Sequence, residues 1–188
     1  TTITDASGGY ITPFGLPTGT YSASTNTNTA YVNEAYDDLP QLTPPANRAP
    51  IEVTVGETTE DIDFALALGG RVSGTITDAG TGQPLAGFGN VTLYDSHGAW
   101  VTSAGLDIGG HYSTSGVPTG TYYVMAYSYA GHIPQIYDGV TCLNCGITGG
   151  TPVTVTVGNT TGGIDFLMVR GGTIAGTIAD AATTTGIT

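Results

Sequence analysis

The chain holds 188 residues, enough for one large or two small domains, and 39% of them are hydrophobic, which suffices for a folded core. Fifteen acidic residues stand against three arginines and no lysine, giving a formal net charge of −12 at pH 7. Nucleic acids and anionic membranes are recognised through basic surfaces, so this charge excludes both as expected partners. No apolar run approaches the roughly 20 residues that cross a bilayer as a helix, so membrane insertion is not expected either.

Glycine and proline punctuate the whole chain, with 30 and 10 residues, among many Thr, Val, Ile and Tyr. Glycine permits the positive φ of tight turns, while β-branched and aromatic residues pack well on a pleated sheet. No stretch is long enough with helical periodicity to predict a helix. The composition therefore predicts an all-β fold. The amino terminus lacks the basic and then apolar plan of a signal peptide, so we expect a mature segment.

The sequence contains an internal repeat, of which the first 68 residues are expected to form an incomplete β-sandwich module. GLPTGTY at 15–21 returns as GVPTGTY at 116–122, and APIEVTV at 49–55 returns as TPVTVTV at 151–157. The second pair is offset by 102 residues, and the first pair by 101. A period of about 100 residues fits a whole sandwich domain in a tandem array.

The complete copy of the module is predicted at 69–170. Alternating residues and turn signals mark seven candidate strands there. They lie at 71–77, 90–95, 99–104, 120–129, 134–138, 151–157 and 163–169. Seven short antiparallel strands in about 100 residues predict an Ig-like β-sandwich.

Two stretches of this copy resemble a known family. GGRVSGTITDAGTGQPLAGFGNVTLYDSHG at 69–98, followed by GGHYSTSGVPTGTYYVMAYSYAG at 109–131, is similar to the carboxypeptidase-regulatory-like, transthyretin-like and Cna-B-like seven-strand sandwiches. The resemblance implies tandem modules of secreted and surface proteins of bacteria, which mostly serve as stalks, spacers and adhesive modules. Cna-B-like modules often carry an internal crosslink from a lysine. This chain has no lysine, so that crosslink cannot form within it.

The candidate strand at 120–129 carries an unusual number of aromatic side chains. Alternation places Tyr122, Val124 and Ala126 on the core face. The opposite face carries a set that we call the tyrosine row: Tyr123, Met125, Tyr127 and Tyr129. Exposed aromatic rows mark interfaces or sugar-binding platforms. Three interpretations stay open: a row covered by its own chain, a contact between subunits, or a glycan platform to which Trp100 contributes.

Cys142 and Cys145 form a single C-x2-C motif. Zinc would need two further ligands, and the three histidines (His97, His111 and His132) fall in unrelated turns and strand edges. A thioredoxin-like redox site would need a helix directly after the pair, and none is predicted. In an extracellular setting a local disulfide is the favoured interpretation, with a metal site as the alternative.

Acidic residues and sequons raise two further questions about ligands and modification. The acidic clusters are Asp37-Asp38, Glu60-Asp61-Ile62-Asp63 and the turns at Asp78 and Asp107. None has the spacing of an EF-hand loop, and aspartate commonly holds a turn through its own side chain. We therefore expect no cofactor, with calcium as the alternative. The sequons at Asn90 and Asn159 could carry glycans.

The tail at 171–188 repeats the first strand of a module and has no module of its own. By the same alignment, the first module has no copy of about 87–102, which is a strand, a turn and a second strand. A sandwich short of strands exposes unpaired backbone and apolar core. Either the tail of one subunit pairs into 1–68 of the next and identical subunits polymerise head to tail, or the sequence is a window of a longer tandem array.

In the first alternative the donor strand comprises Thr173, Ile174, Ala175, Gly176, Thr177 and Ile178, with the two isoleucines facing inward. The acceptor core includes Tyr21, Ile62, Phe64 and Leu66. No G-x-S-x-G, H-E-x-x-H or phosphate-binding glycine loop is present, so no enzyme is expected. The sequence predicts a structural subunit of an extracellular filament or surface stalk. The alternative is a carbohydrate-binding or adhesive module that uses the tyrosine row and Trp100.

Overall fold

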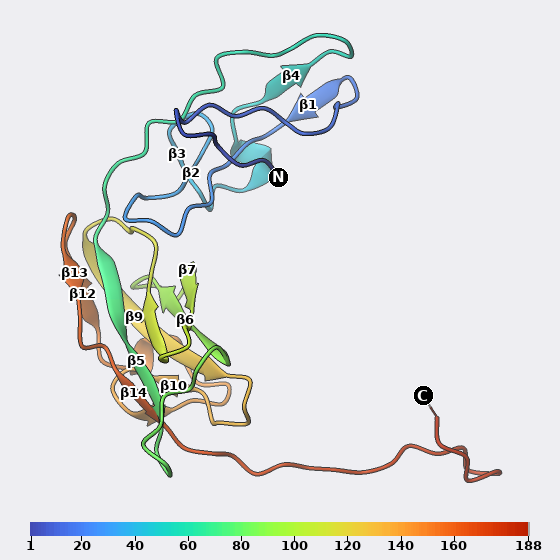
Figure 1. The fold of residues 1–188 in the computed structure, drawn as a ribbon, viewed down its shortest axis with the longest axis vertical. Coiled ribbons are helices and arrows are strands. Elements are labelled where there is room, and N and C mark those ends of the chain that lie inside the picture. The colour runs from blue at the N-terminus through green and yellow to red at the C-terminus, as the bar shows by residue number, and fades with distance from the viewer. Residues whose placement is uncertain (188) are drawn as a thin grey trace.

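The computed structural model describes residues 1–187 and is an all-β structure with two short 3-10 turns (Figure 1). Three segments follow one another: an open first part at 1–68, a two-layer β-sandwich at 69–170 and an extended tail. The tail leaves the sandwich at the end opposite to the first part (Figure 1). Among residues 1–187 there is no helix long and apolar enough to cross a membrane.

One sheet of the sandwich is antiparallel and is built around β9. On one side of β9 (Gly120–Ser128) lies β6 (Gly89–Tyr94), followed by the edge strand β7 (Trp100–Gly105). On the other side, β12 (Val153–Val155) and β10 (Gln135–Ile136) pair with different parts of β9. β11 (Val140–Thr141) pairs with β10 and forms the edge there. The β6–β9 pairing is the longest, running from Gly89 opposite Ser128 to Tyr94 opposite Tyr123. This pairing fixes which residues of β9 face the core.

The second sheet is built around β5 (Arg71–Asp78). β8 (His111–Ser113) pairs antiparallel with one edge of β5. β13 (Thr160–Thr161) and β14 (Phe166–Met168) pair with the other edge, and both run parallel to β5. The prediction that all strands pair antiparallel is therefore wrong for this edge. Each of the seven predicted strands overlaps an observed one, whereas the two- and three-residue strands β8, β11 and β13 were not predicted.

The core lies between the two sheets. β9 contributes Tyr122, Val124 and Ala126, the face that alternation predicted, and β5 contributes Val72 and Ile76. The other members are Leu85, Val91, Leu93, Tyr112, Val117, Val153, Val155, Ile164, Phe166 and Met168. Burying side chains of this size stabilises the folded state by about 1.5–3 kcal/mol each. The sandwich therefore has a continuous core of its own.

The first part repeats half of this architecture. β1 (Gly19–Tyr21) pairs with β4 (Ile51–Val53), and β2 (Glu34–Ala35) pairs with β3 (Leu39–Pro40). These pairs have the registers of β9 with β12 and of β10 with β11, shifted by one repeat. The 3-10 turn η1 (Pro45–Asn47) likewise matches η2 (Ile147–Gly149). Within residues 1–187 the first part contains no counterparts of β5 and β6.

Candidate assembly interface

The first part presents one apolar face that the described chain covers incompletely. Its members, which are the predicted acceptor core, are Tyr21, Ile62, Phe64 and Leu66, and all are half-buried. Their counterparts one repeat later are Tyr122, Ile164, Phe166 and Met168, and all are buried. The registers of β1 with β4 and of β2 with β3 match those of the sandwich, so the difference arises from strands that the first part lacks. In the sandwich, β5 lies beside β14 in one sheet and β6 lies beside β9 in the other.

The side chains of this face already have the arrangement of a sandwich core. The ring of Phe64 lies 6.1 Å from Tyr36 and 6.4 Å from Tyr10, centroid to centroid. In the sandwich Phe166 lies 6.0 Å from Tyr137, the counterpart of Tyr36. The face is therefore preorganised to receive the strands that the first part lacks.

A tyrosine hydroxyl in each copy also closes the same long-range contact. Tyr10 donates to the carbonyl of Ile62, and Tyr112 donates to the carbonyl of Ile164. Burial raises the pKa of the Tyr10 hydroxyl, and the negative charge of Asp63 adds to that effect. Burial raises the pKa of Tyr112 as well. Each hydroxyl stays protonated at neutral pH and ties together two segments 52 positions apart.

The repeated P-T-G-T-Y turn explains why the first part keeps this shape. Tyr21 donates to the carbonyl of Pro17 at 2.9 Å, as Tyr122 donates to that of Pro118 at 2.8 Å. In the first copy the hydroxyl of Thr18 accepts from the N–H of Val55. In the second copy the hydroxyl of Thr119 accepts from the N–H of Val157. These bonds involve only residues that both copies contain, so the turn forms in both.

The predicted donor strand lies in the tail and is exposed along its whole length. Residues 173–178 belong to no strand; Ile174 is fully exposed and Ile178 is 75% exposed. The turn after it nevertheless has the geometry of the turn after β5. The carboxylate of Asp180 accepts from the N–H groups of Ala182 and Thr183 at 2.8 and 2.7 Å. The Asp78 carboxylate accepts two equivalent bonds, each of 2.8 Å.

Backbone hydrogen bonds extend this likeness to the strand itself. The N–H of Ile187 donates to the carbonyl of Ile178 at 2.9 Å, and the N–H of Leu85 donates to that of Ile76 at 2.9 Å. The tail is thus a copy of β5 and its turn that lacks partner strands within residues 1–187.

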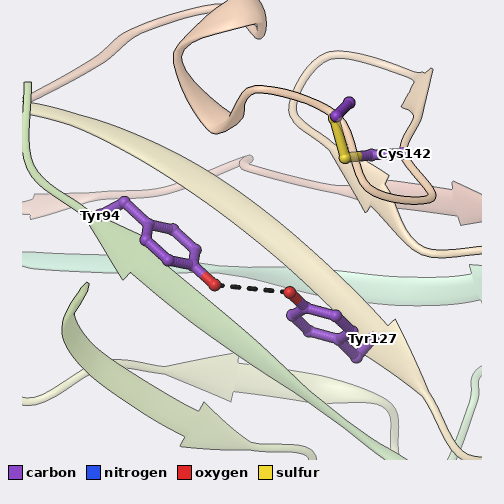
Figure 2. Close-up of a disulfide and its surroundings, with 4 residues drawn as sticks. Tyr94, Tyr127 and Cys142 are labelled. Carbon is purple, nitrogen blue, oxygen red and sulfur yellow. Dashed lines mark hydrogen bonds between the residues drawn. A yellow bond between two sulfur atoms is a disulfide. The ribbon is translucent and has the colours of Figure 1, made fainter. Parts of the chain in front are cut away.

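The tyrosine row is not a continuous exposed platform, and its covered members fit the interpretation of a row covered by its own chain. Met125 is buried and Tyr127 is half-buried, because the loop that carries the two cysteines covers them. Figure 2 shows the hydroxyl of Tyr127 facing that of Tyr94 at 3.4 Å beside the disulfide. Burial and this hydrogen bond raise the pKa of Tyr94 to about 12. Tyr123 is half-buried, and Tyr129 is the one exposed member of the row.

Cys142 and Cys145 are joined by a disulfide (Figure 2). Cys142 packs with Met125 and Ile136 in a small second core, and a cavity of about 350 Å³ lies beside it. Reading strand alternation alone could not reveal this cluster, because the loop that closes it has no strand periodicity. The disulfide holds that loop over β9.

The turn aspartates are engaged by backbone N–H groups. Asp5, Asp95 and Asp107 each accept two such bonds at 2.8–2.9 Å. These bonds hold the pKa of each carboxyl below its usual value, with the hydroxyl of Ser7 the largest cause at Asp5. Across residues 1–187 no group of three His, Cys, Asp or Glu side chains is placed to hold a metal ion.

A buried polar chain at the base of the sandwich was missed by the sequence analysis. His132 lies between Ser128 and Asp78, at 3.0 and 2.8 Å, and its side chain is fully buried. Arg170 contacts the same carboxylate at 3.3 Å. Asp78 and His132 are 54 positions apart, so no local motif signals the pair. These hydrogen bonds and the contact with Arg170 connect the end of β5 to the point where the tail begins.

Of the remaining predicted surface residues, Asn90 and Trp100 share one face, because hydrogen bonds through Thr92 and Ser103 link their side chains. Asn90 lies in β6, and its amide oxygen accepts from Tyr129 at 3.3 Å. Asn159 lies in an exposed turn before β13, so it is the more accessible of the two sequon asparagines. Trp100 is 45% exposed on β7, and its indole donates to Ser103.

No family model matches the sequence, and no curated protein is significantly similar to it. Membership of the repeat family that the sequence resembles therefore stays a prediction. Among solved structures, the chain is similar to the Bacillus anthracis TIE protein, with 17% identity, a TM-score of 0.41, and 90% of this chain and 28% of that one covered.

Two pilus proteins are similar at the same level. The minor pilin of Streptococcus agalactiae has 18% identity and a TM-score of 0.39, with 85% of this chain and 63% of that one covered. The pilus 2b backbone protein of group B streptococcus has 16% identity and a TM-score of 0.36, with 83% and 53% covered. The chain thus spans less than two thirds of the length of all three proteins, and these likenesses assign no role to it.

Proposed function

We propose that the chain is a structural subunit of an extracellular filament or surface stalk, and that identical subunits join head to tail by strand complementation. The proposal rests on one observation: the first part and the tail each contain a part of the repeat that the other lacks. The first part has the β9-to-β12 half of a module with its apolar face half-covered, and the tail has a copy of β5 with no partner strands in the described chain.

The sandwich gives the register of the proposed contact. β5 pairs with β14 so that Phe166 lies opposite Ile76 and Leu167 opposite Thr77. Shifted by one repeat, Ile178 of the tail lies opposite Phe64 of the second copy, and Ala179 opposite Ala65. Ile174 then takes the place of Val72, and both isoleucines enter the face formed by Tyr21, Phe64 and Leu66.

The proposed partner is another copy of the chain. The tail leaves the sandwich at the end away from the first part and runs clear of it, so a second copy can reach it (Figure 1). Burying the two isoleucines contributes about 1.5–3 kcal/mol each, and the pairing satisfies backbone groups along an exposed edge. A contact of this kind is heterologous, and repeating it produces a filament.

The glycan-binding alternative is weakened by the arrangement of the tyrosine row. Met125 and Tyr127 are covered by the disulfide loop, so Tyr129 and Trp100 are the exposed aromatic residues left from the predicted platform. A sugar platform needs rings that lie together on one accessible surface. Tyr129 and Trp100 lie at the two ends of a hydrogen-bonded row through Asn90, Thr92 and Ser103, so polar side chains separate the two rings.

Electron microscopy of the 188-residue chain, beside a version that ends at Arg170, tests the proposal. We expect filaments from the full chain and monomers from the shortened one. Both samples need about 0.15 M salt, which screens the charge of −12 on each copy. Filaments from both versions, or from neither, would contradict the proposal.

A further inference from the structure

The junction between the first part and the sandwich is made by backbone atoms. The N–H of Gly116 donates to the carbonyl of Thr29 at 2.9 Å, and the N–H of Gly69 donates to that of Ala30 at 2.8 Å. A Cβ at Gly116 would clash with the carbonyl of Ala30. Glycine is therefore required at 116, because the backbone of the first part lies directly against it.

The far end of the sandwich repeats the first half of this junction. The N–H of Gly171 donates to the carbonyl of Gly131 at 2.9 Å, as the N–H of Gly69 donates to that of Ala30 at 2.8 Å. A second hydrogen bond, from the N–H of Ile133 to the carbonyl of Val169, is 2.9 Å long. It matches the bond of 2.9 Å from the N–H of Val32 to the carbonyl of Ala67. Residues 130–133 therefore present the surface that residues 29–32 present to the sandwich.

The first part carries the other half of the junction in its sequence. Gly15 and Leu16 are the repeat counterparts of Gly116 and Val117. Gly15 is exposed, its φ is not positive, and a Cβ there would meet nothing within 4 Å. No contact within residues 1–187 therefore requires a glycine at position 15.

Two glycines of the tail show the same pattern. A Cβ on Gly172 or Gly176 would meet nothing within 4 Å. Their counterparts Gly70 and Gly74 are packed against the carbonyls of Thr156 and Ile164, and a Cβ on either would clash. All three open glycines thus stand where the neighbouring repeat needs a close approach of two backbones.

We propose that Ala130–Ile133 of one copy docks on Gly15–Leu16 of a second copy, so that the junction between subunits repeats the junction within the chain. The carbonyl of Ala130 accepts from the N–H of Gly15 on the second copy, whereas a pairing of Gly172 with Leu16 would belong to strand donation, as that of Gly70 with Val117 belongs to the sandwich. This surface is separate from the donor strand, although the inference rests on the proposed head-to-tail assembly. Every step from module to module along the filament is then equivalent.

The substitution Gly15→Val tests this docking surface, with Gly146→Val as the matched control. Gly146 is also exposed, has φ −69° and would meet nothing within 4 Å, but it lies in the cysteine loop. The critical concentration for assembly is measured by sedimentation of each full-length variant. We expect Gly15→Val to raise it by at least about tenfold and Gly146→Val to leave it unchanged; tenfold corresponds to roughly 1.4 kcal/mol.

A peptide of residues 173–188, added to the chain that ends at Arg170, measures strand pairing without the docking surface. We expect Gly15→Val to leave the affinity of this peptide within about twofold of the parent value. Assembly of Gly15→Val at the parent concentration would overturn the docking proposal while the peptide still binds. An equal loss of peptide affinity and assembly would overturn it too, because Gly15 would then act through the fold of the first part. Failure of the peptide to bind the parent chain would instead contradict strand donation itself.

Discussion

The first part and the sandwich share strand registers, turns and aromatic contacts but differ in burial. Phe64 and Phe166 lie in equivalent places, yet Phe166 is 2% exposed while Phe64 is half-buried. Hydrogen bonds that close within a repeat, such as those of Tyr21 and Tyr122, are the same in both. Local sequence therefore determines the shape of the strand pairs in each copy, whereas burial depends on the strands that pair beside them.

The largest effect is expected from placing charges in the donor strand, which should abolish filament formation. The double variant Ile174→Asp, Ile178→Asp places two carboxylates where the account puts apolar anchors, and burying an unpaired charge is strongly unfavourable. We expect no filaments at any concentration tested by electron microscopy. Because both side chains are exposed in the isolated chain, thermal unfolding of the sandwich should be unchanged. Filaments from this variant would mean that the tail is not the donor.

The second largest effect is expected from truncating the two equivalent phenylalanines, because only one of them lies in a closed core. Phe166→Ala should lower the free energy of unfolding of the sandwich by about 3–5 kcal/mol, because it leaves a cavity in a closed core. Phe64→Ala should cost the unassembled chain roughly 1–2 kcal/mol, because the ring is already half in water. Denaturant unfolding of the chain that ends at Arg170 measures both values. Equal costs would show that the first part has a closed core in solution.

The two equivalent aspartates should differ in their effect at low pH. The hydrogen bond from His132, with the backbone N–H groups of Thr81 and Gly80, holds the pKa of Asp78 below its usual value. A folded-state pKa below the unfolded one stabilises the fold at neutral pH, and this contribution is lost as the pH falls below about 4. Asp180 has the same turn bonds without the histidine.

Unfolding of Asp78→Asn and Asp180→Asn between pH 7 and pH 2 measures this difference. We expect Asp78→Asn to be less stable than the parent at pH 7 and to approach the parent at the acid end. Asp180→Asn should match the parent throughout, since its turn lies in the exposed tail. A constant difference between Asp78→Asn and the parent across the pH range would rule out the carboxylate as the cause.

Removing the turn hydroxyls should have the smallest effect. Tyr122→Phe loses a partly buried hydrogen bond and should cost about 1 kcal/mol of unfolding free energy. Tyr21→Phe loses the same bond in an exposed setting, where water replaces it, and should cost less. Chemical denaturation of the two variants measures both costs. A larger cost for Tyr21→Phe would contradict the view that the first part is the more exposed copy.

Much of this architecture could be predicted from local patterns. Alternation located the core face of β9, and the P-T-G-T-Y turn located the repeat, because both are determined by neighbouring residues. The pairing of β13 and β14 parallel to β5 could not be predicted, since alternation fixes the face of a strand but not its partner. The covered Met125 and the Asp78–His132 pair depend on loops that carry no periodic signal.

Oxidative crosslinking of a paired-cysteine variant tests strand donation most directly. In the proposed register Ala65 lies opposite Ala179 of another copy, and cysteines on adjacent strands lie within the 4.4–6.8 Å Cα separation that a disulfide needs. The double variant Ala65→Cys, Ala179→Cys should give a ladder of covalent multimers on a non-reducing gel. The control Ala65→Cys, Ala175→Cys is shifted by four residues, about 13 Å along the strand, and should stay monomeric. No ladder from the first variant, or equal ladders from both, would contradict the account.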